Sequence, residues 1–152
     1  MRYFKRSLLY GTDEDKRKAK TFDQVHHAYL QHLKVIRPKL SEAAWTLAGL
    51  TFHDAKVLSV AQPSRRELLI SLEGGYSGCG YDFMNDKLLN GRFTSLSFLG
   101  VKKFWVPQTI VGDYWLYEEM TLSDIAMFDY QVLLAKDEIR IQADEVEIRT
   151  HD

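Results

Sequence analysis

A change in the spacing of apolar residues near residue 54 constrains the fold of this chain more than any other feature. Before that point, five apolar residues recur at intervals of three and four, the spacing of one face of an α-helix. They are Phe22, Val25, Tyr29, Leu33 and Ile36. After it, apolar and polar residues alternate, which is typical of strands with one buried face. The sequence therefore predicts helices first and strands afterwards.

Local signals predict where the helices begin and end. Thr12 and Thr21 each stand three residues before a side chain that completes a capping box, so we expect the long helix to begin near residue 13. Pro38 ends it, because proline cannot continue a helix. Ser41 then caps a second, short helix over residues 41–49. Both helices need a surface to pack on.

The remainder of the chain reads as antiparallel strands joined by turns. Strands are expected over 55–61, 67–75, 79–86, 92–101, 113–120, 125–136 and 137–150. In the last of these the apolar parity slips at Asp144 and Glu145, which predicts a β-bulge or a tight turn. We predict an α+β fold, with N-terminal helices packed on a curled antiparallel sheet of about six strands. Residues 1–152 form one domain, mainly helical over 1–50 and mainly antiparallel β over 51–152.

Composition and charge narrow the function classes. With 45% hydrophobic and 27% charged residues, the chain has the composition of a soluble globular protein, and we expect a cytoplasmic location without membrane contact. Cys79 is the only cysteine, so no intrachain disulfide can form. The net charge of −1 is unevenly divided, since the last forty residues hold eleven acids and three bases. That asymmetry favours a basic protein partner over nucleic acid, or simply a solvated acidic face.

Short motifs give the chain a family resemblance. The opening MRYF, the FHD at residues 52–54, the LSFLGV strand end and the closing IRIQADEVEI resemble a group of small bacterial proteins classified only as domains of unknown function. The resemblance covers most of the chain, and its motifs are short and mainly structural. It implies a bacterial cytosolic α+β protein with no established activity. The small acidic α+β architecture is also similar in style to immunity proteins that neutralise toxins, which is an analogy of class.

His53 and Asp54 are the first candidates for a ligand site. Adjacent residues in a regular strand point to opposite faces, so this pair faces one cleft only if the entry to the strand is irregular. We favour a structural role for both side chains at the strand entry and keep a ligand-binding role open. Cys79, in a glycine-rich loop, could approach His53 in three dimensions.

The stretch 102–120 is the first candidate for a partner surface. It collects five aromatic residues around a proline, and Tyr and Trp are frequent anchors of interfaces. If one parity were exposed, Trp115, Tyr117, Glu118 and Glu119 would form an aromatic and acidic patch suited to a basic protein. The alternative is that both aromatic sets pack inside a curled sheet. Glu118 and Glu119 point to opposite sides of a strand and so make no acid/base pair by themselves.

No other pattern in the sequence carries chemistry. His26, His27 and His32 lack the spacing of three or four that places metal ligands on one helix face, so we predict neither a metal site nor a cofactor. No catalytic residue is assigned. The sequence favours a non-enzymatic protein-binding module, monomeric or homodimeric, such as a toxin-neutralising immunity protein. The alternative is a small-molecule-binding protein or hydrolase whose cleft lies near His53, Asp54 and Cys79.

Overall fold

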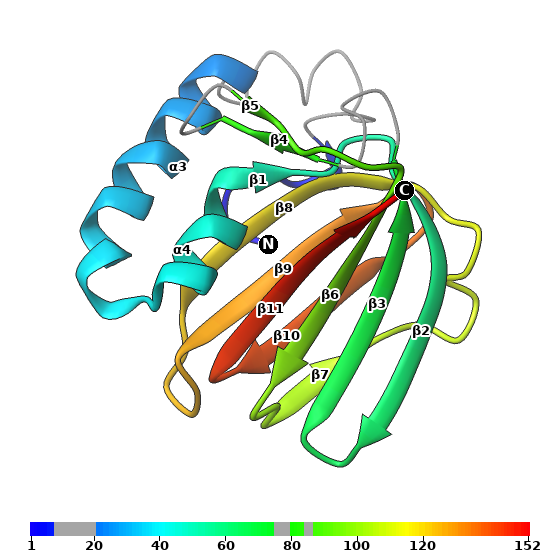
Figure 1. The fold of residues 1–152 in the computed structure, drawn as a ribbon. Coiled ribbons are helices and arrows are strands. Elements are labelled where there is room, and N and C mark those ends of the chain that lie inside the picture. The colour runs from blue at the N-terminus through cyan, green and yellow to red at the C-terminus, as the bar shows by residue number, and fades with distance from the viewer. Residues whose placement is uncertain (8–20, 75–79, 84–86) are drawn as a thin grey trace.

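Helices come first along the chain and strands follow, as the change in apolar spacing predicts (Figure 1). The computed structural model describes residues 1–7, 21–74, 80–83 and 87–152. The helices are α3 (Phe22–Ile36), the 3-10 helix η1 (Arg37–Lys39) and α4 (Glu42–Gly49). The strands are β1 (Leu50–Thr51), β2 (Lys56–Ser64), β3 (Glu67–Glu73), β4 (Tyr81–Asp82), β5 (Lys87–Leu88), β6 (Phe93–Leu99), β7 (Lys103–Trp105), β8 (Trp115–Leu122), β9 (Phe128–Leu134), β10 (Glu138–Ala143) and β11 (Glu145–His151).

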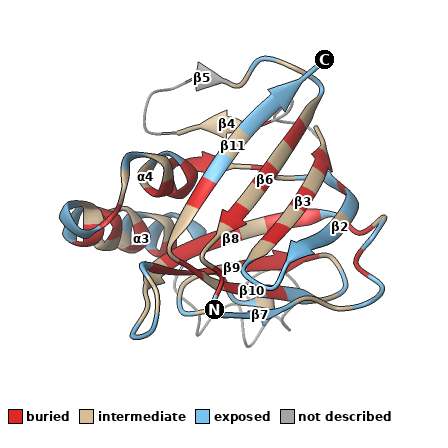
Figure 2. Cartoon of the chain, turned by 60° about the horizontal axis from the view of Figure 1, so that its bottom comes forward, coloured by how far each residue is buried: buried red, intermediate tan, exposed pale blue. Residues whose placement is uncertain are grey.

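Two four-stranded antiparallel sheets hold the core between them. One has the strand order β11-β6-β3-β2 and the other the order β7-β10-β9-β8. Phe98 of the first sheet meets Phe128 and Tyr130 of the second, with ring centroids 6.4 Å and 5.8 Å apart. Burial alternates along β3 and β6, where every second residue is buried (Figure 2). The predicted one-sided strands are therefore confirmed, and their apolar side chains fill the space between the sheets.

A shared corner joins the two sheets. β6 pairs with β11 in one sheet, and β7 pairs with β10 in the other. Along the chain, β6 is followed by β7 and β10 by β11, so both connections run from one sheet to the other. Gly100 turns the first strand with φ +63°, and Asp144 lies opposite and donates its backbone N–H to Leu99 O at 3.1 Å. The parity slip at Asp144 and Glu145 marks this corner. The predicted irregularity is confirmed as a bend that moves the strand from one sheet to the other.

The helices lie together on one side of the sheets (Figure 1). Thr21 caps α3 through the predicted capping box with Gln24, and Ser41 caps α4 by accepting the N–H of Ala44 at 3.2 Å. α3 packs on β8 and α4 packs on β11. The other predicted helix start, near residue 13, lies outside the described residues. No helix in the described ranges has both the length and the apolar character needed to span a bilayer.

The expectation of a single curled sheet of about six strands is wrong, although the α+β class holds. In the described ranges the strands divide into three sheets, because the corner at Gly100 separates β6 from β7 and the short strands β1, β4 and β5 form a sheet of their own. The alternation of apolar residues shows which side chains share a face, and it does not show which strands pair. β7 was not predicted, since its three residues are all exposed and carry no buried face.

Candidate functional site

A cavity of about 300 Å³ lies between α3, residues 1–7, β1, β4 and β8. The residues that line it come from every one of these segments and from the turn after β1. They are Phe4, Phe22, His26, Tyr29, Thr51, His53, Tyr81, Phe83, Tyr117 and Glu118. Most of this wall is aromatic, and a few polar groups interrupt it. Such a composition is usual for small-molecule sites.

Tyr117 is the centre of the aromatic wall. Its ring stacks on Phe4 at 5.3 Å between centroids and with an interplanar angle of 13°. Phe22 approaches it at 5.4 Å from α3, and His53 meets it edge-on at 5.2 Å. Aromatic pairs at these separations are attractive beyond the area that they bury. The wall is thus held by ring contacts between four segments that are distant in sequence.

Glu118 supplies the acidic group of the cavity. Its side chain lines the cavity, although the residue is only 6% exposed. Burial raises the pKa of Glu118 from 4.5 to about 7, because a charged carboxylate loses solvation inside the protein. Hydrogen bonds from the side chains of Trp115 and Thr51 and from the backbone of Phe52 oppose this shift. The carboxyl group is therefore poised to gain or lose a proton near neutral pH.

A β-bulge in β8 produces this arrangement. The register with β9 shifts between Trp115 and Tyr117, so Trp115 pairs with Leu134 and Tyr117 pairs with Leu133. In a regular strand, two residues that are three positions apart point to opposite faces. The extra residue of a β-bulge between them places both on the same face. Trp115 Nε1 consequently reaches Glu118 Oε2 at 2.6 Å. The predicted shared face of Trp115 and Tyr117 is wrong for the same reason.

His53 and Asp54 occupy a turn between β1 and β2. Ala55 N donates to Phe52 O at 2.8 Å across this turn, and Asp54 has a φ of +64°, in the left-handed region. The irregular entry brings His53 Nδ1 to 3.1 Å from Asp54 Oδ2, so the two adjacent side chains do contact each other. Asp54 also donates its backbone N–H to Trp115 O at 2.7 Å, which fixes the turn to β8. His53 lines the cavity, and Asp54 is not one of the lining residues.

The expected exposed patch of Trp115, Tyr117, Glu118 and Glu119 is corrected by burial. Trp115 and Glu119 are 0% exposed and Glu118 is 6% exposed, while Tyr117 is half-buried in the cavity wall. The bulge turns Trp115 into the core, and α3 with residues 1–7 covers the opposite side of β8. These four side chains therefore do not present an open acidic surface to a partner.

Glu119 has a structural task on that covered side. Its carboxylate accepts the backbone N–H groups of Arg2, Tyr3 and Phe4, the last two at 2.8 Å and 3.2 Å. Hydrogen bonds from several backbone amides satisfy a buried carboxylate without a cation. Glu119 therefore ties the segment that carries Phe4 to β8. As predicted, Glu118 and Glu119 act on different sides of the strand.

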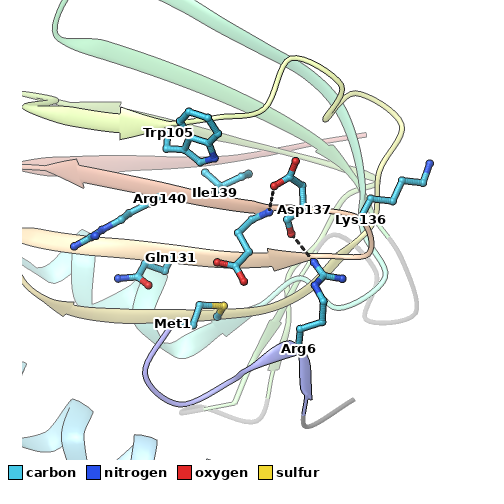
Figure 3. Close-up of a pocket in the computed structure, with 9 residues that line it drawn as sticks. Met1, Arg6, Trp105, Gln131, Lys136, Asp137, Ile139 and Arg140 are labelled. Atoms are coloured by element: carbon cyan, nitrogen blue, oxygen red, sulfur yellow. Dashed lines mark hydrogen bonds between the residues drawn. The ribbon is translucent and has the colours of Figure 1, made fainter. Parts of the chain in front are cut away.

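A second, more open cavity of about 430 Å³ lies over β9 and β10 (Figure 3). Its wall is polar, and Arg6 crosses it to donate to Ala135 O, Leu134 O and Asp137 O at 2.7, 2.9 and 3.0 Å. Arg140, also in the wall, pairs with the buried Asp129. Because both guanidinium groups already hold the fold together, we take the aromatic cavity as the candidate site.

Most cavity residues gave no signal in the sequence. Phe22 and Tyr29 were assigned to the apolar stripe of the helix, yet both also line the cavity, and Phe22 is 40% exposed. Tyr81 is the last residue of the glycine-rich stretch 73–81, and Phe83 follows it, while the candidate residue Cys79 of that stretch is outside the described residues. The sequence did indicate His53 as a ligand candidate, with Asp54 beside it, and Tyr117 and Glu118 as candidates for a partner surface. His26 lines the cavity as an aromatic wall residue, meeting Phe83 edge-on at 5.8 Å.

Comparison with known proteins gives a family. A family model described as protein of unknown function (DUF4085) matches residues 6–141. Comparisons with the curated proteins and with the solved structures found no match. The matched range includes α3, the turn at His53 and Asp54, and all of β8, so it contains nearly the whole cavity wall. The chain belongs to the DUF4085 family.

Proposed function

We propose that this protein binds a small organic molecule in the aromatic cavity. The observation that carries the proposal is the burial of Glu118 in a largely aromatic wall, where its carboxyl group lines a space of about 300 Å³. Burying a carboxyl group costs free energy, which the hydrogen bonds of Glu118 from Trp115, Thr51 and Phe52 offset only in part. Perturbed acids in apolar cavities are therefore candidates for function.

The cavity suits a small ligand. Its volume is at the lower end of the range for ligand sites, about 300 to 1,000 Å³. Phe22 and His53 stand at the more exposed part of its wall, and Tyr29 and Glu118 are buried. A ligand entering past α3 would contact rings first and the carboxyl group last.

A fragment titration followed by amide NMR tests this proposal. We expect fragments from a set of mixed charge to shift resonances of residues 51–53 and 117–118. Phe22→Ala should weaken binding several-fold and leave the fold intact, because the ring is partly exposed. Val35→Ala, on the same helix and 75% exposed, is the matched control and should change nothing. A set in which no fragment shifts the cavity resonances would contradict the proposal.

Acid–base catalysis on the bound molecule is a second candidate. His53 and Glu118 line one cavity, and Asp54 Oδ2 lies 3.1 Å from His53 Nδ1, where it can orient the ring. Hydrolysis of a panel of nitrophenyl esters, with His53→Asn and Glu118→Gln compared against the native chain, tests this. Activity unchanged in both variants would exclude the two side chains from catalysis.

Most of the residues proposed to bind a basic protein partner, as in an immunity protein, are buried. Three of the four side chains expected at that surface are at most 6% exposed. Support for a partner surface would have to come from other acidic residues of the chain. The cavity therefore gives the stronger proposal.

A further inference from the structure

Among the described residues, the lining of the aromatic cavity has one carboxyl group, that of Glu118, and two imidazoles, those of His26 and His53, which carry a charge only when protonated. Neither lysine nor arginine is found in its lining, which the structure draws from the described residues alone. Glu118 also forms no ion pair with a cationic side chain of those same ranges; its hydrogen bonds come from Trp115, Thr51 and the backbone. When such a carboxyl group is ionised, its negative charge is not neutralised by a cationic side chain. A positive charge brought by a ligand would balance it.

The rings around Glu118 favour the same sign of charge. The face of an aromatic ring carries negative potential and attracts cations, most strongly where water is excluded. Six phenyl or phenol rings come from residues 1–7, α3, β4 with the residue that follows it, and β8 to enclose the space near this carboxyl group. An anion would meet aromatic rings and a carboxylate, and the described lining offers it no lysine or arginine. A neutral ligand would leave the acid unpaired.

Two buried tyrosines interact electrostatically with Glu118. The hydroxyl oxygen of Tyr130 is buried and has no hydrogen-bond partner within the described part of the chain. Burial, and after it the charge of Glu118, raises the pKa of Tyr130, which is not one of the lining residues. Tyr29, whose hydroxyl accepts the N–H of Met120 at 2.7 Å, does line the cavity. These groups offer oxygen atoms and no positive charge.

We infer that the ligand of the aromatic cavity is a small organic cation, an ammonium compound whose charge rests against Glu118 and whose alkyl groups rest against the rings. This inference rests on the proposed small-molecule function and names its ligand class. Apolar walls strengthen the attraction between the two charges, since little water screens them. Alkylated ammonium groups suit such walls because they are less hydrated than a bare ammonium and contact aromatic faces well.

Three probes of nearly equal shape and different charge test the inference. Choline is the cation, 3,3-dimethylbutan-1-ol replaces its nitrogen by carbon and is neutral, and 3,3-dimethylbutanoate is the anion. Dissociation constants are measured by amide NMR titration at a pH above 7, where Glu118 is ionised. We expect choline to bind about tenfold more tightly than the alcohol, as a desolvated cation–π site with a carboxylate requires. The anion should bind most weakly.

Variants identify the group that selects the charge. Glu118→Gln keeps the shape and an acceptor for Trp115 but removes the charge, so choline and the alcohol should then bind alike. Glu138→Gln, an exposed carboxylate on β10, is the matched control and should keep the preference. Circular dichroism and amide spectra establish that each variant is folded. Rescue of choline binding by Glu118→Asp would support the charge over the exact shape.

Each outcome separates the inference from the proposed function. Equal binding of choline and the alcohol to the native chain, with cavity resonances shifted, overturns the cation and leaves small-molecule binding supported. Preference for the anion also overturns the cation alone. If none of the three probes shifts the cavity resonances, the inference fails, and the mixed-charge fragment titration decides the proposed function separately.

Discussion

Trp115 Nε1 donates a 2.6 Å hydrogen bond to Glu118 Oε2, and a β-bulge between these residues is what lets them meet. The bulge places a core tryptophan and a buried acid on one side of β8. The indole stabilises the charged form of the carboxyl group, yet burial still raises the pKa of Glu118 to about 7. This balance has a measurable effect on stability.

The pKa of Glu118 predicts a loss of stability with rising pH. The native carboxyl group titrates at about 7 and the unfolded one at about 4.5, so the native state holds a proton that the unfolded state has lost between these values. The free energy of unfolding should therefore fall as pH rises through this window, by about 3 kcal/mol from this group. Glu118→Gln should lack that fall.

Urea unfolding at several pH values between about 4.5 and about 8 measures the effect. The difference between the native chain and Glu118→Gln isolates the contribution of this group from that of the other ionisable groups. Glu138→Gln, on the exposed face of β10, should follow the native curve. Parallel curves for the native chain and Glu118→Gln would show that the acid is not desolvated.

Gly100→Ala should destabilise the corner between the sheets. A Cβ at this position would lie 2.5 Å from Asp144 Oδ2, and the φ of +63° is unfavourable for alanine. Gly112→Ala is a matched control, because φ is +87° there and nothing lies within 4 Å of the added carbon. We expect about 1 kcal/mol of lost stability for the control and about 2 to 3 kcal/mol for Gly100→Ala, from thermal or urea unfolding. Equal losses would mean that Asp144 moves aside freely.

Glu119→Ala should release the first residues of the chain from β8. The substitution leaves the backbone N–H groups of Arg2, Tyr3 and Phe4 without their acceptor, and each such loss costs about 1 to 3 kcal/mol unless water replaces it. Faster hydrogen exchange at residues 2–4, with unchanged exchange in β9 and β10, is the expected result. Glu147→Ala, on an exposed position of β11, should leave exchange as it is. Unaltered protection at residues 2–4 would show that ring packing alone holds the segment.

Asp54 separates turn geometry from side-chain chemistry. Its φ of +64° suits glycine and asparagine, so Asp54→Gly and Asp54→Asn should fold with nearly native stability. Asp54→Ala should lose about 1 kcal/mol, because alanine pays a steric penalty in the left-handed region. Thermal unfolding of the three variants compares them directly. An Asp54→Ala variant as stable as Asp54→Gly would show that the turn relaxes to another conformation.

Local signals were the predictable part of this fold. Thr21 and Ser41 cap helices because a hydroxyl before a helical stretch satisfies backbone N–H groups within three residues. Leu68, Ile70 and Leu72 alternate because a strand with one buried face has no other arrangement. Both inferences need only neighbours in the sequence.

Pairing of strands and assembly of the cavity were not predictable in this way. The corner at Gly100 depends on Asp144, and the cavity joins Phe4, Thr51 and Tyr117 from three distant segments. The bulge in β8 also places Trp115 and Tyr117 on opposite faces of the strand, whereas the candidate exposed patch had both on one face. The sequence indicated His53 as a ligand residue, because an aspartate beside a histidine at a strand entry is visible without knowledge of the fold, and it indicated Tyr117 and Glu118 only as residues of a partner surface.

The hydrogen bonds between Glu119 and residues 2–4 join positions that are 115 to 117 residues apart in the sequence, so one wall of the cavity depends on very long-range contacts. Closing so long a loop lowers the conformational entropy of the chain before the contacts that offset this loss have formed. Such contacts are therefore slow to form. We expect the strands to pair before the wall that carries Phe4 docks. The free energy needed to detach this wall should be lower than the free energy needed to unfold the sheets. The protein would then have a partly open state through which a molecule can enter the cavity.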